Sequence, residues 1–298
     1  MKPFEINRIL VPLDFSGASL LALEFAVHMS KKFSADMTLL HVMETMAFTS
    51  GEYAMTSLDI ETEVQRSVDK RLNTALGSIK GRTGGKVNLR SETGRIYKSI
   101  IGAAGEEKAD LIVMGTHGAS GFQEFFIGTN TYRVVSEAPC PVLSVRTDAR
   151  KNAFKNIVLP IDDSLHSRQK VIHALRIAKM YDSRVHILGL LIDDIQNDTA
   201  ASKRFTKKVE LVQDYFKKHE VSNTTQFLIG KNPATLTMNY ATKEEADLII
   251  IMTEQEPGVS GLFMGPYAQQ VVNHSSTPVL SISPDFNPDT VDMHGYGW

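Results

Sequence analysis

The 298-residue chain contains a single cysteine, Cys140, which excludes an intrachain disulfide and a cysteine-based zinc site. An excess of charge is also lacking, because 32 lysines and arginines nearly balance 34 aspartates and glutamates. This balance gives no electrostatic reason to expect nucleic acid or an anionic membrane surface as a partner. The nine histidines show no metal-binding spacing, so we assign no metal-ligating residue. Cys140 lies between two prolines before an apolar run, and we interpret it as a packing residue.

Long hydrophobic runs are missing as well. No segment approaches the ~18 uninterrupted apolar residues of a membrane span, and the first residues lack the apolar core and small-residue cleavage site of a signal peptide. We therefore expect a cytoplasmic protein without a membrane partner, and the single cysteine fits a reducing compartment.

What the chain does contain is an internal repeat. Three segments recur in the same order, namely 8–14 at 156–162, 109–114 at 246–251, and 141–145 at 278–282. This order predicts two tandem domains, 1–149 and 150–283, followed by a tail over 284–298. The first segment recurs after 148 residues and the other two after 137, so the first half carries about eleven extra residues, which we place at 45–59.

Each half alternates short β-branched runs with longer amphipathic stretches. In the first half we expect strands at 9–13, 37–42, 87–90, 111–114 and 142–145, and helices at 19–32, 60–79, 97–108 and 129–136. Right-handed crossovers then predict an α/β fold of two Rossmann-like domains, each a five-stranded parallel sheet with helices on both faces. We expect two sheets rather than one continuous ten-stranded sheet, because each half completes its own pattern.

Two loops at the carboxyl edge of the first sheet carry the chemistry of a ligand site. The first strand ends at Asp14, whose carboxylate can accept a hydrogen bond from a base or sugar, although capping the next helix is a competing role. The fourth strand opens at Gly115 into a loop containing Gly118, and the following helix starts at Gly128-Thr129. Glycines expose backbone amides and a helix N-terminus attracts anions, which suits a phosphate chain.

The glycine-rich loop lacks the cation of a P-loop. No lysine or arginine occurs between Lys108 and Arg133, and the spacing differs from Gly-x-x-x-x-Gly-Lys. Amides, hydroxyls and Mg²⁺ are therefore expected to balance the phosphate charge. Since a clamping cation and an arginine finger are not evident, we expect nucleotide retention with at most slow hydrolysis and assign no catalytic residue.

At this loop the sequence resembles the ATP-binding universal stress proteins. Gly115-x-x-Gly118 followed after nine residues by Gly128-Thr129 looks like their Gly-2x-Gly-9x-Gly-Ser/Thr motif. The segments 11–14, 40–42 and 141–143 resemble the first, second and last strands of the same family. The resemblance implies a tandem member whose two Rossmann-like domains are of the HUP type and whose first domain binds ATP.

The resemblance also implies a set of nucleotide contacts, with adenine and ribose at the ends of the first two strands, the sugar beside the fourth, and the phosphates at the loop and the next helix. The implied residues are Asp14, Val42, Met114, Gly115, Gly118, Gly128, Thr129 and Asn130, and we add His117 as a candidate from its place inside the loop. His117 either contacts ribose or phosphate or is an exposed loop residue without a role.

The second half departs from this motif. Gly115, Gly118 and Thr129 become Met252, Gln255 and Pro266, while Gly128 is kept as Gly265. The new side chains stand where close backbone approach is needed, and the proline removes a hydroxyl and an amide donor. Asp162 persists at the end of the first strand, so an adenosine or small neutral ligand stays open.

The second half is expected to keep its fold for pairing with the first and for contacts with a protein partner. The family resemblance implies pseudo-twofold docking of the halves, since single-domain members dimerise through the last strand, and a homodimer stays open.

These features favour a stress-response protein in which ATP acts as a switch read by an unidentified protein partner. A scaffold for dimer or partner binding without nucleotide is the alternative, and a slow ATPase or phosphotransferase is a third. Retention of nucleotide by the purified protein separates the first from the second.

Overall fold

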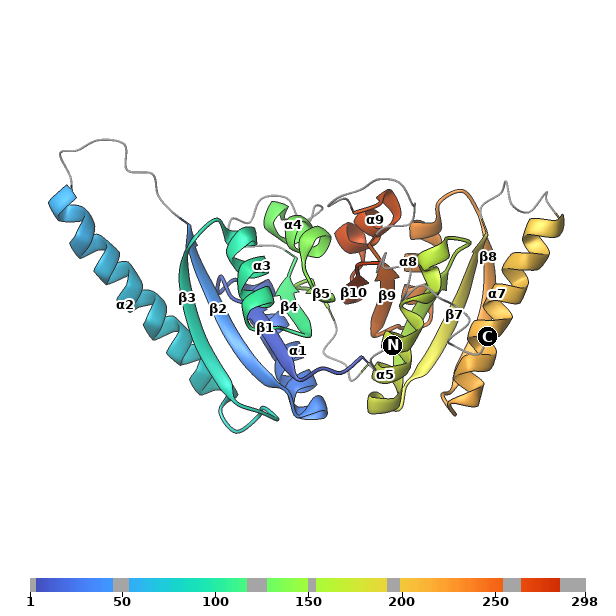
Figure 1. The fold of residues 1–298 in the computed structure, drawn as a ribbon, viewed down its shortest axis with the longest axis horizontal. Coiled ribbons are helices and arrows are strands. Elements are labelled where there is room, and N and C mark those ends of the chain that lie inside the picture. Colours follow the sequence, from blue (N-terminus) through green and yellow to red (C-terminus); the bar gives the residue numbers. More distant parts are fainter. Residues whose placement is uncertain are drawn as a thin grey trace.

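The computed structural model describes residues 4–44, 54–116, 128–149, 154–191, 199–253 and 264–284, and strands alternate with helices in both halves (Figure 1). The first half comprises β1 (Arg8–Pro12), α1 (Gly17–Phe33), β2 (Asp36–Glu44), α2 (Ala54–Ile79), β3 (Val87–Gly94), α3 (Ile96–Glu106), β4 (Leu111–Gly115), α4 (Thr129–Glu137) and β5 (Val142–Val145). The second comprises β6 (Asn156–Ile161), the 3₁₀ helix η1 (Leu165–Arg168), α5 (Val171–Tyr181), β7 (Arg184–Leu191), α7 (Thr199–Lys218), β8 (Asn223–Ile229), α8 (Pro233–Lys243), β9 (Leu248–Met252), α9 (Pro266–His274) and β10 (Val279–Ile282).

The predicted elements of the first half are present, and most ends agree within two residues. The exceptions are β3, which runs to Gly94 rather than Arg90, and α2, which begins at Ala54 rather than Ile60. Two lysines stand in the last turn of helix α1, as expected, and at its start the Ser19 backbone N–H donates to the Ser16 hydroxyl.

The ten strands within the described residues form one sheet in the order β3-β2-β1-β4-β5-β10-β9-β6-β7-β8. Neighbouring strands are parallel within each half, whereas β5 and β10 pair antiparallel at the centre, with Leu143 opposite Leu280. The expectation of two separate sheets is therefore wrong. Each half does complete its own parallel pattern, but that pattern leaves its last strand with an open edge, and the two edges satisfy each other's backbone groups. Joining through the last strands is the docking that the family resemblance implied.

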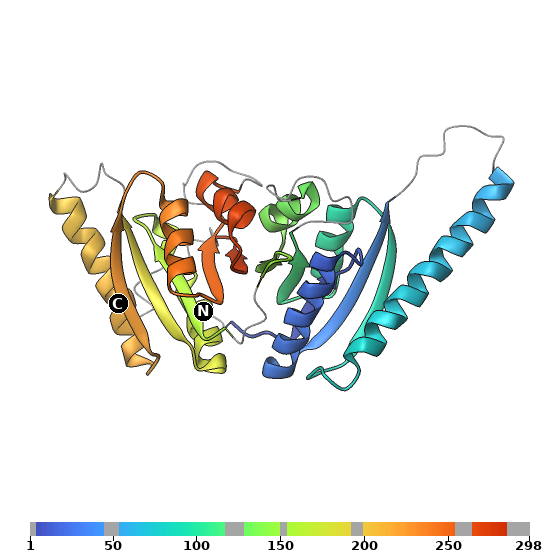
Figure 2. The same ribbon diagram turned by 180° about the vertical axis from the view of Figure 1, so that it is seen from behind.

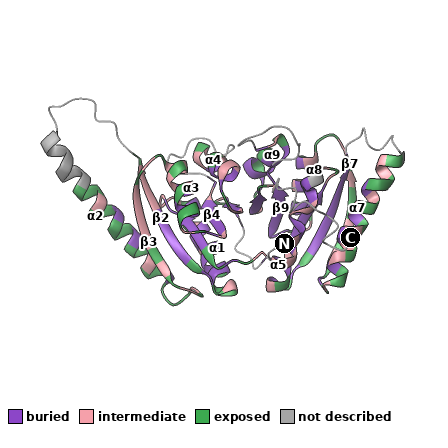
Figure 3. Cartoon of the chain, in the orientation of Figure 1, coloured by how far each residue is buried: buried purple, intermediate pink, exposed green. Residues whose placement is uncertain are grey.

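Helices cover both faces of the sheet (Figure 2). One core lies between the sheet and α1, α2, α5 and α7, and the other lies between the sheet and α3, α4, α8 and α9. The central strands are buried along their length, as their apolar runs predict (Figure 3).

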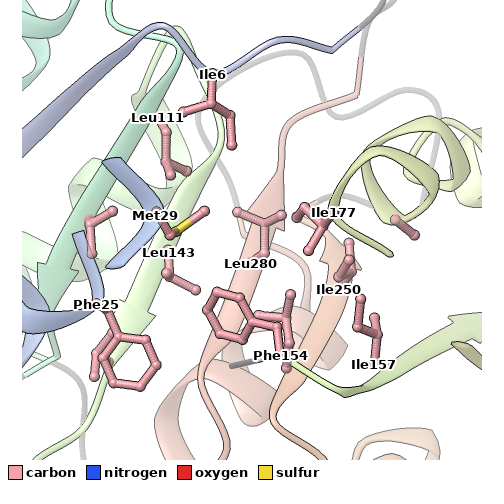
Figure 4. Packing of buried hydrophobic residues seen from close by; sticks show 14 of the residues in the cluster. Ile6, Phe25, Met29, Leu111, Leu143, Phe154, Ile157, Ile177, Ile250 and Leu280 are labelled. Atoms are coloured by element: carbon pink, nitrogen blue, oxygen red, sulfur yellow. The ribbon is translucent and has the colours of Figure 1, made fainter. Parts of the chain in front are cut away.

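The core beneath α1 and α5 runs without a break from one half to the other (Figure 4). Phe154, from the segment that connects the halves, is 1% exposed. Its ring lies 5.8 Å from the ring of Phe25 on α1 and 5.2 Å from that of Tyr181 on α5, measured between centroids. Burying a side chain of this size stabilises a fold by about 2–3 kcal/mol, so the connection itself helps to hold the halves together.

The extra length of the first half is spread over several places. Helix α2 has 26 residues and α7 has 20, and the turn after the helix is also longer, at 80–86 compared with 219–222. Placing all the extra residues at 45–59 is therefore wrong in part, because the turn at 80–86 holds three of them, whereas the six by which α2 is longer fall within the predicted range, at 54–59. Residues 45–53 lie outside the described residues.

Across the ranges that the structure describes, none of the helices combines the length and the hydropathy needed to cross a bilayer.

Candidate functional site

A cleft of about 460 Å³ lies at the carboxyl edge of the first half of the sheet. It is flanked by β1 and β4, which are neighbours in the sheet although β2 and β3 separate them in the chain. This reversal of strand order is where open α/β sheets bind ligands. Seven residues predicted from the sequence line the cleft, namely Asp14, Val42, Met114, Gly115, Gly128, Thr129 and Asn130. His117 and Gly118, also predicted, lie outside the described residues.

The cleft has further walls that sequence reasoning missed. They are formed by Pro12, Leu13, Ser19, Leu40, Glu44, Ile96, Ile100 and Thr131. Ile96 and Ile100 stand four residues apart on α3, a spacing that marks one face of a helix but does not distinguish a cleft wall from a core. Ser19 has a weaker signal still, since it resembles an ordinary residue of a helix first turn.

Two hydrogen bonds fix the start of α4 against the end of β4. The Gly128 N–H donates to the Thr116 carbonyl at 2.9 Å, and the Thr131 hydroxyl donates to the Gly115 carbonyl at 3.1 Å. Gly128 is the N-cap residue and has no side chain with which to cap the helix. The first-turn N–H groups of a helix have no intrahelical acceptor, and Thr129 and Asn130 of this turn line the cleft. This end of the cleft is thus suited to an anion.

Gly115 is a glycine for a reason that its motif did not reveal. A Cβ atom built there would stand 2.7 Å from the Ala18 carbonyl carbon and 2.8 Å from the Ser19 nitrogen. Both atoms belong to the backbone of the first turn of α1, so they have no rotamer by which to move aside. The glycine therefore lets α1 cross closely over the end of β4, which brings Ser19 to the cleft.

Another part of the cleft wall is organised around Asp14. Its Oδ1 accepts hydrogen bonds from the Ser16 backbone N–H at 3.0 Å and from the Ser16 hydroxyl at 2.6 Å, as in an Asx turn. Ser16, not Asp14, is the N-cap residue of α1, so the competing role foreseen for Asp14 belongs to its neighbour. Asp14 supports the capping residue while it lines the cleft.

Phe15, between these two residues, has φ of 63°, a left-handed conformation that is uncommon for an aromatic residue. The ring is held from two sides. The Arg71 guanidinium lies 4.2 Å from its centroid, and the His41 ring lies 4.9 Å away. His41 is itself fixed by a 2.6 Å hydrogen bond between its Nδ1 and the Leu13 carbonyl. These contacts define the path of the chain beside Asp14.

Among the described residues that line the cleft, the charged ones are Asp14 and Glu44, both acidic. A triphosphate would therefore need helix amides, hydroxyls and a cation that it brings with it. Mg²⁺ commonly binds through one or two carboxylates together with substrate phosphates. Within the described ranges no three His, Cys, Asp or Glu side chains gather into a metal site, so phosphate oxygens would have to complete the coordination of such an ion.

In the second half two of the equivalent positions carry buried side chains, Met252 and Tyr267. Met252, at the place of Gly115, is 2% exposed. Since a Cβ at Gly115 would collide with the first turn of α1, the helix that follows β6 has to begin differently. It does so, because the 3₁₀ helix η1 precedes α5, which starts only at Val171. Tyr267, at the place of Asn130, is 7% exposed and its hydroxyl lies 3.1 Å from that of Thr237.

The altered helix start also buries a lysine. Lys170, at the place of Ala22, is 2% exposed, and its Nζ donates to the Ser167 hydroxyl at 3.2 Å. Burial lowers the pKa of Lys170 to about 8, an effect opposed by the charge of Asp162 and reinforced by that of Lys208. The second half thus has a buried lysine amine next to the carboxyl edge of the sheet, at the position where the first half has an alanine.

Cys140 is half-buried. Burial, together with the charge of Asp110, raises the pKa of its thiol to about 12. The thiol stays protonated at neutral pH, in agreement with its interpretation as a packing residue.

The architecture and the two unequal sites can now be compared with known proteins. The model of the universal stress protein family matches residues 5–146 and, a second time, residues 153–283. The chain belongs to the universal stress protein family. The family and the tandem arrangement predicted from the sequence are thereby confirmed, and the two matches fall inside the predicted ranges 1–149 and 150–283.

Universal stress proteins of about half this length are among its relatives. Universal stress protein MJ0531 of Methanocaldococcus jannaschii is 30% identical over 140 residues, which make up 47% of this chain and 82% of the relative. Universal stress protein YxiE of Bacillus subtilis is 32% identical over 147 residues, or 47% of this chain and 99% of the relative.

Two solved structures resemble the whole tandem fold. A universal stress protein from Archaeoglobus fulgidus has a TM-score of 0.68 at 19% identity and covers 95% of this chain and 98% of its own. A Pseudomonas aeruginosa protein of unknown function has a TM-score of 0.66 at 19% identity and covers 99% of both chains. At this identity the likeness concerns the fold.

Proposed function

We propose that this universal stress protein binds ATP, together with Mg²⁺, in the cleft of its first half and acts in the cytoplasm as a nucleotide-dependent switch read by a protein partner. In this proposal residues 1–149 form the nucleotide-binding domain, residues 150–283 form a companion domain with a degenerate site, and residues 284–298 form a tail.

The observation that carries the proposal is the convergence of seven motif residues on one cleft at the point of strand-order reversal. Its volume of about 460 Å³ lies within the range of small-molecule sites. The wall formed by Val42, Ile96 and Ile100 is apolar and suits a base, whereas the uncapped start of α4 suits phosphates. The cleft thus offers an apolar wall and an anion-binding helix start, which correspond to the base and the phosphates of a nucleotide.

The charges around the cleft favour binding over turnover. Enzymes that transfer phosphoryl groups place a lysine or arginine against the developing charge, and none stands among the described lining residues. We therefore expect the protein to hold ATP and to hydrolyse it slowly at most.

The test is to denature the purified protein and to identify the released nucleotide by mass spectrometry. Thr129→Pro copies the second half, where Pro266 occupies the first position of α9. Proline is well tolerated at that position of a helix, so the substitution removes a hydroxyl and an amide while the fold is kept. We expect Thr129→Pro and Gly118→Gln to release at least about tenfold less nucleotide than the wild type, since each removes phosphate contacts.

Pro266→Thr is the matched control, because it changes the equivalent position of the other half and should leave retention unchanged. Equal retention by Thr129→Pro would place the site elsewhere. Absence of nucleotide from the wild type, with no ATP affinity by calorimetry, would favour the scaffold without nucleotide.

A further inference from the structure

The two outer strands, β3 and β8, are the opposite edges of the sheet, and helices α2 and α7 are drawn beyond them (Figure 1). In the described part of the chain, β3 pairs with β2 and β8 pairs with β7, each on one side. The outer side of such a strand carries backbone N–H and C=O groups that can pair with another strand. The two edges differ in the side chains that accompany these groups.

The β3 edge is protected by charge. Arg90, in the middle of the strand, forms ion pairs with Glu92 on the same strand and with Glu106 and Glu107 at the end of α3. The Arg90–Glu107 distance is 3.0 Å and the Arg90–Glu106 distance is 2.5 Å. A neighbouring strand would have to desolvate this cluster. Charged side chains are a usual means of keeping an edge strand from pairing.

The β8 strand carries no charge of its own, and the charges nearest in the fold are Lys243 and Glu244 at the end of α8, which form an ion pair of opposite signs with each other at 3.7 Å. The sequence of β8, Asn-Thr-Thr-Gln-Phe-Leu-Ile over residues 223–229, contains no charged residue and no proline. Phe227 is 37% exposed and Ile229 is 47% exposed, and they supply two of the four exposed large hydrophobic side chains in the described ranges. Because they stand two residues apart on a strand, both lie on the same face of the sheet. Within the described ranges, the edge therefore combines an outer side that pairs with no other strand with exposed apolar surface.

At the centre of the same sheet, two uncharged edge strands pair with each other. Strands β5 (Val-Leu-Ser-Val) and β10 (Val-Leu-Ser-Ile) carry no charge, and they pair antiparallel to join the two halves. A pair of identical strands related by a two-fold axis is also antiparallel. Strand β8 can meet a second β8 in this way without any like charges facing each other.

We propose that β8 is the docking edge for a second copy of this chain, paired antiparallel about a two-fold axis. Phe227 and Ile229 of each copy then lie next to the partner strand and lose their exposure. Cross-strand contacts between such side chains stabilise a strand pair. The proposal is independent of nucleotide binding, because β8 belongs to the half with the degenerate motif.

The size of the edge sets the strength expected of this dimer. Seven residues at about 3.3 Å each give a strand about 23 Å long. Such a pair buries less than the ~800 Å² per partner of a standard stable interface. The dimer should accordingly be reversible, with a dissociation constant of about 10–100 μM rather than nanomolar.

The test is sedimentation velocity on the full chain from about 1 to 500 μM, a range that brackets the expected dissociation constant. The mass should rise with concentration from 33.0 kDa towards twice that value. Ile229→Lys and Gln226→Lys each place a charge at an exposed position of β8 and should weaken the dimer about tenfold or more. Asn88→Lys, at an exposed position of β3, is the matched control and should dimerise like the wild type.

Circular dichroism and thermal melting would show that the three variants fold, since each changes an exposed side chain. A wild type that stays at 33.0 kDa throughout the range overturns the proposal. So does a dimer that both β8 variants leave intact, or one that Asn88→Lys weakens as strongly as they do.

Discussion

The contact between Gly115 and the first turn of α1 predicts a large effect for a single added methyl group. In Gly115→Ala the new Cβ would meet the Ala18 carbonyl carbon at 2.7 Å and the Ser19 nitrogen at 2.8 Å. Real Cβ atoms do not approach other heavy atoms this closely, so α1 has to move away from β4. Forcing extra volume into a packed site destabilises by about 1–3 kcal/mol, and we expect a loss of that size in the free energy of unfolding.

Gly102→Ala is the matched control. Gly102 lies on the exposed side of α3, and a Cβ built there meets no atom within 4 Å. Alanine is the better helix former by about 0.5–1 kcal/mol, so this variant should be more stable than the wild type. The two Gly→Ala substitutions are thus expected to change stability in opposite directions, and the gap between them should be about 1.5–4 kcal/mol.

Urea unfolding followed by circular dichroism measures both variants. Nucleotide retention should fall in Gly115→Ala, because moving the first turn of α1 displaces Ser19 from the cleft, and it should be unchanged in Gly102→Ala. A Gly115→Ala protein as stable as the wild type would refute the reasoning. It would also remove our explanation for the 3₁₀ helix that follows β6 in the half where Met252 replaces the glycine.

Two pH-dependent predictions concern Lys170, which is buried, and His173, which is partly buried. The pKa of Lys170 is lowered from 10.5 to about 8, so its burial penalty is fully present below pH 8 and fades as the pH rises towards 10.5. Lys170→Met should therefore have a free energy of unfolding up to about 3 kcal/mol higher than that of the wild type at pH 7. In urea titrations this difference should disappear by about pH 10. A variant less stable than the wild type at pH 7 would contradict the prediction. Burial lowers the pKa of His173, packed 4.2 Å from Phe4 between ring centroids, from 6.5 to about 4. The stability that neutral His173 contributes is present above pH 6.5 and is lost as the pH falls to 4. The free energy of unfolding of His173→Leu, measured at pH 4.5 and 7, should therefore change less between these two pH values than that of the wild type. An equal change in both proteins would contradict the prediction.

Much of the fold was accessible from the sequence because its signals are local. The first, fourth and fifth strands of the first half are short apolar runs, and their repetition in the second half identified both domains. The joint between the halves was not accessible in the same way. The apolar composition of Val142–Val145 does not show whether a further strand pairs with its outer edge. The strand that does so, Val279–Ile282, lies more than a hundred residues away in the sequence.

The candidate site divides along the same line. Asp14, Gly115 and Gly128 were identifiable because they directly follow a strand or precede a helix in a recognisable motif. Ile96 and Ile100 were missed because their helical spacing is that of any core-facing pair. The packing role of Gly115 was invisible too, since the atoms that exclude a side chain there come from α1, nearly a hundred residues earlier.

The central β5–β10 joint has a consequence for how the two sites can diverge. In a homodimer every substitution occurs in both subunits, so a residue that spoils one pocket spoils both and symmetry is preserved. Here the equivalent surfaces belong to one polypeptide, and each can change alone. The cleft of the second half can be filled by Met252, Tyr267 and Lys170 while the cleft of the first half stays open. The second half still supplies β10, the strand with which β5 of the first half pairs.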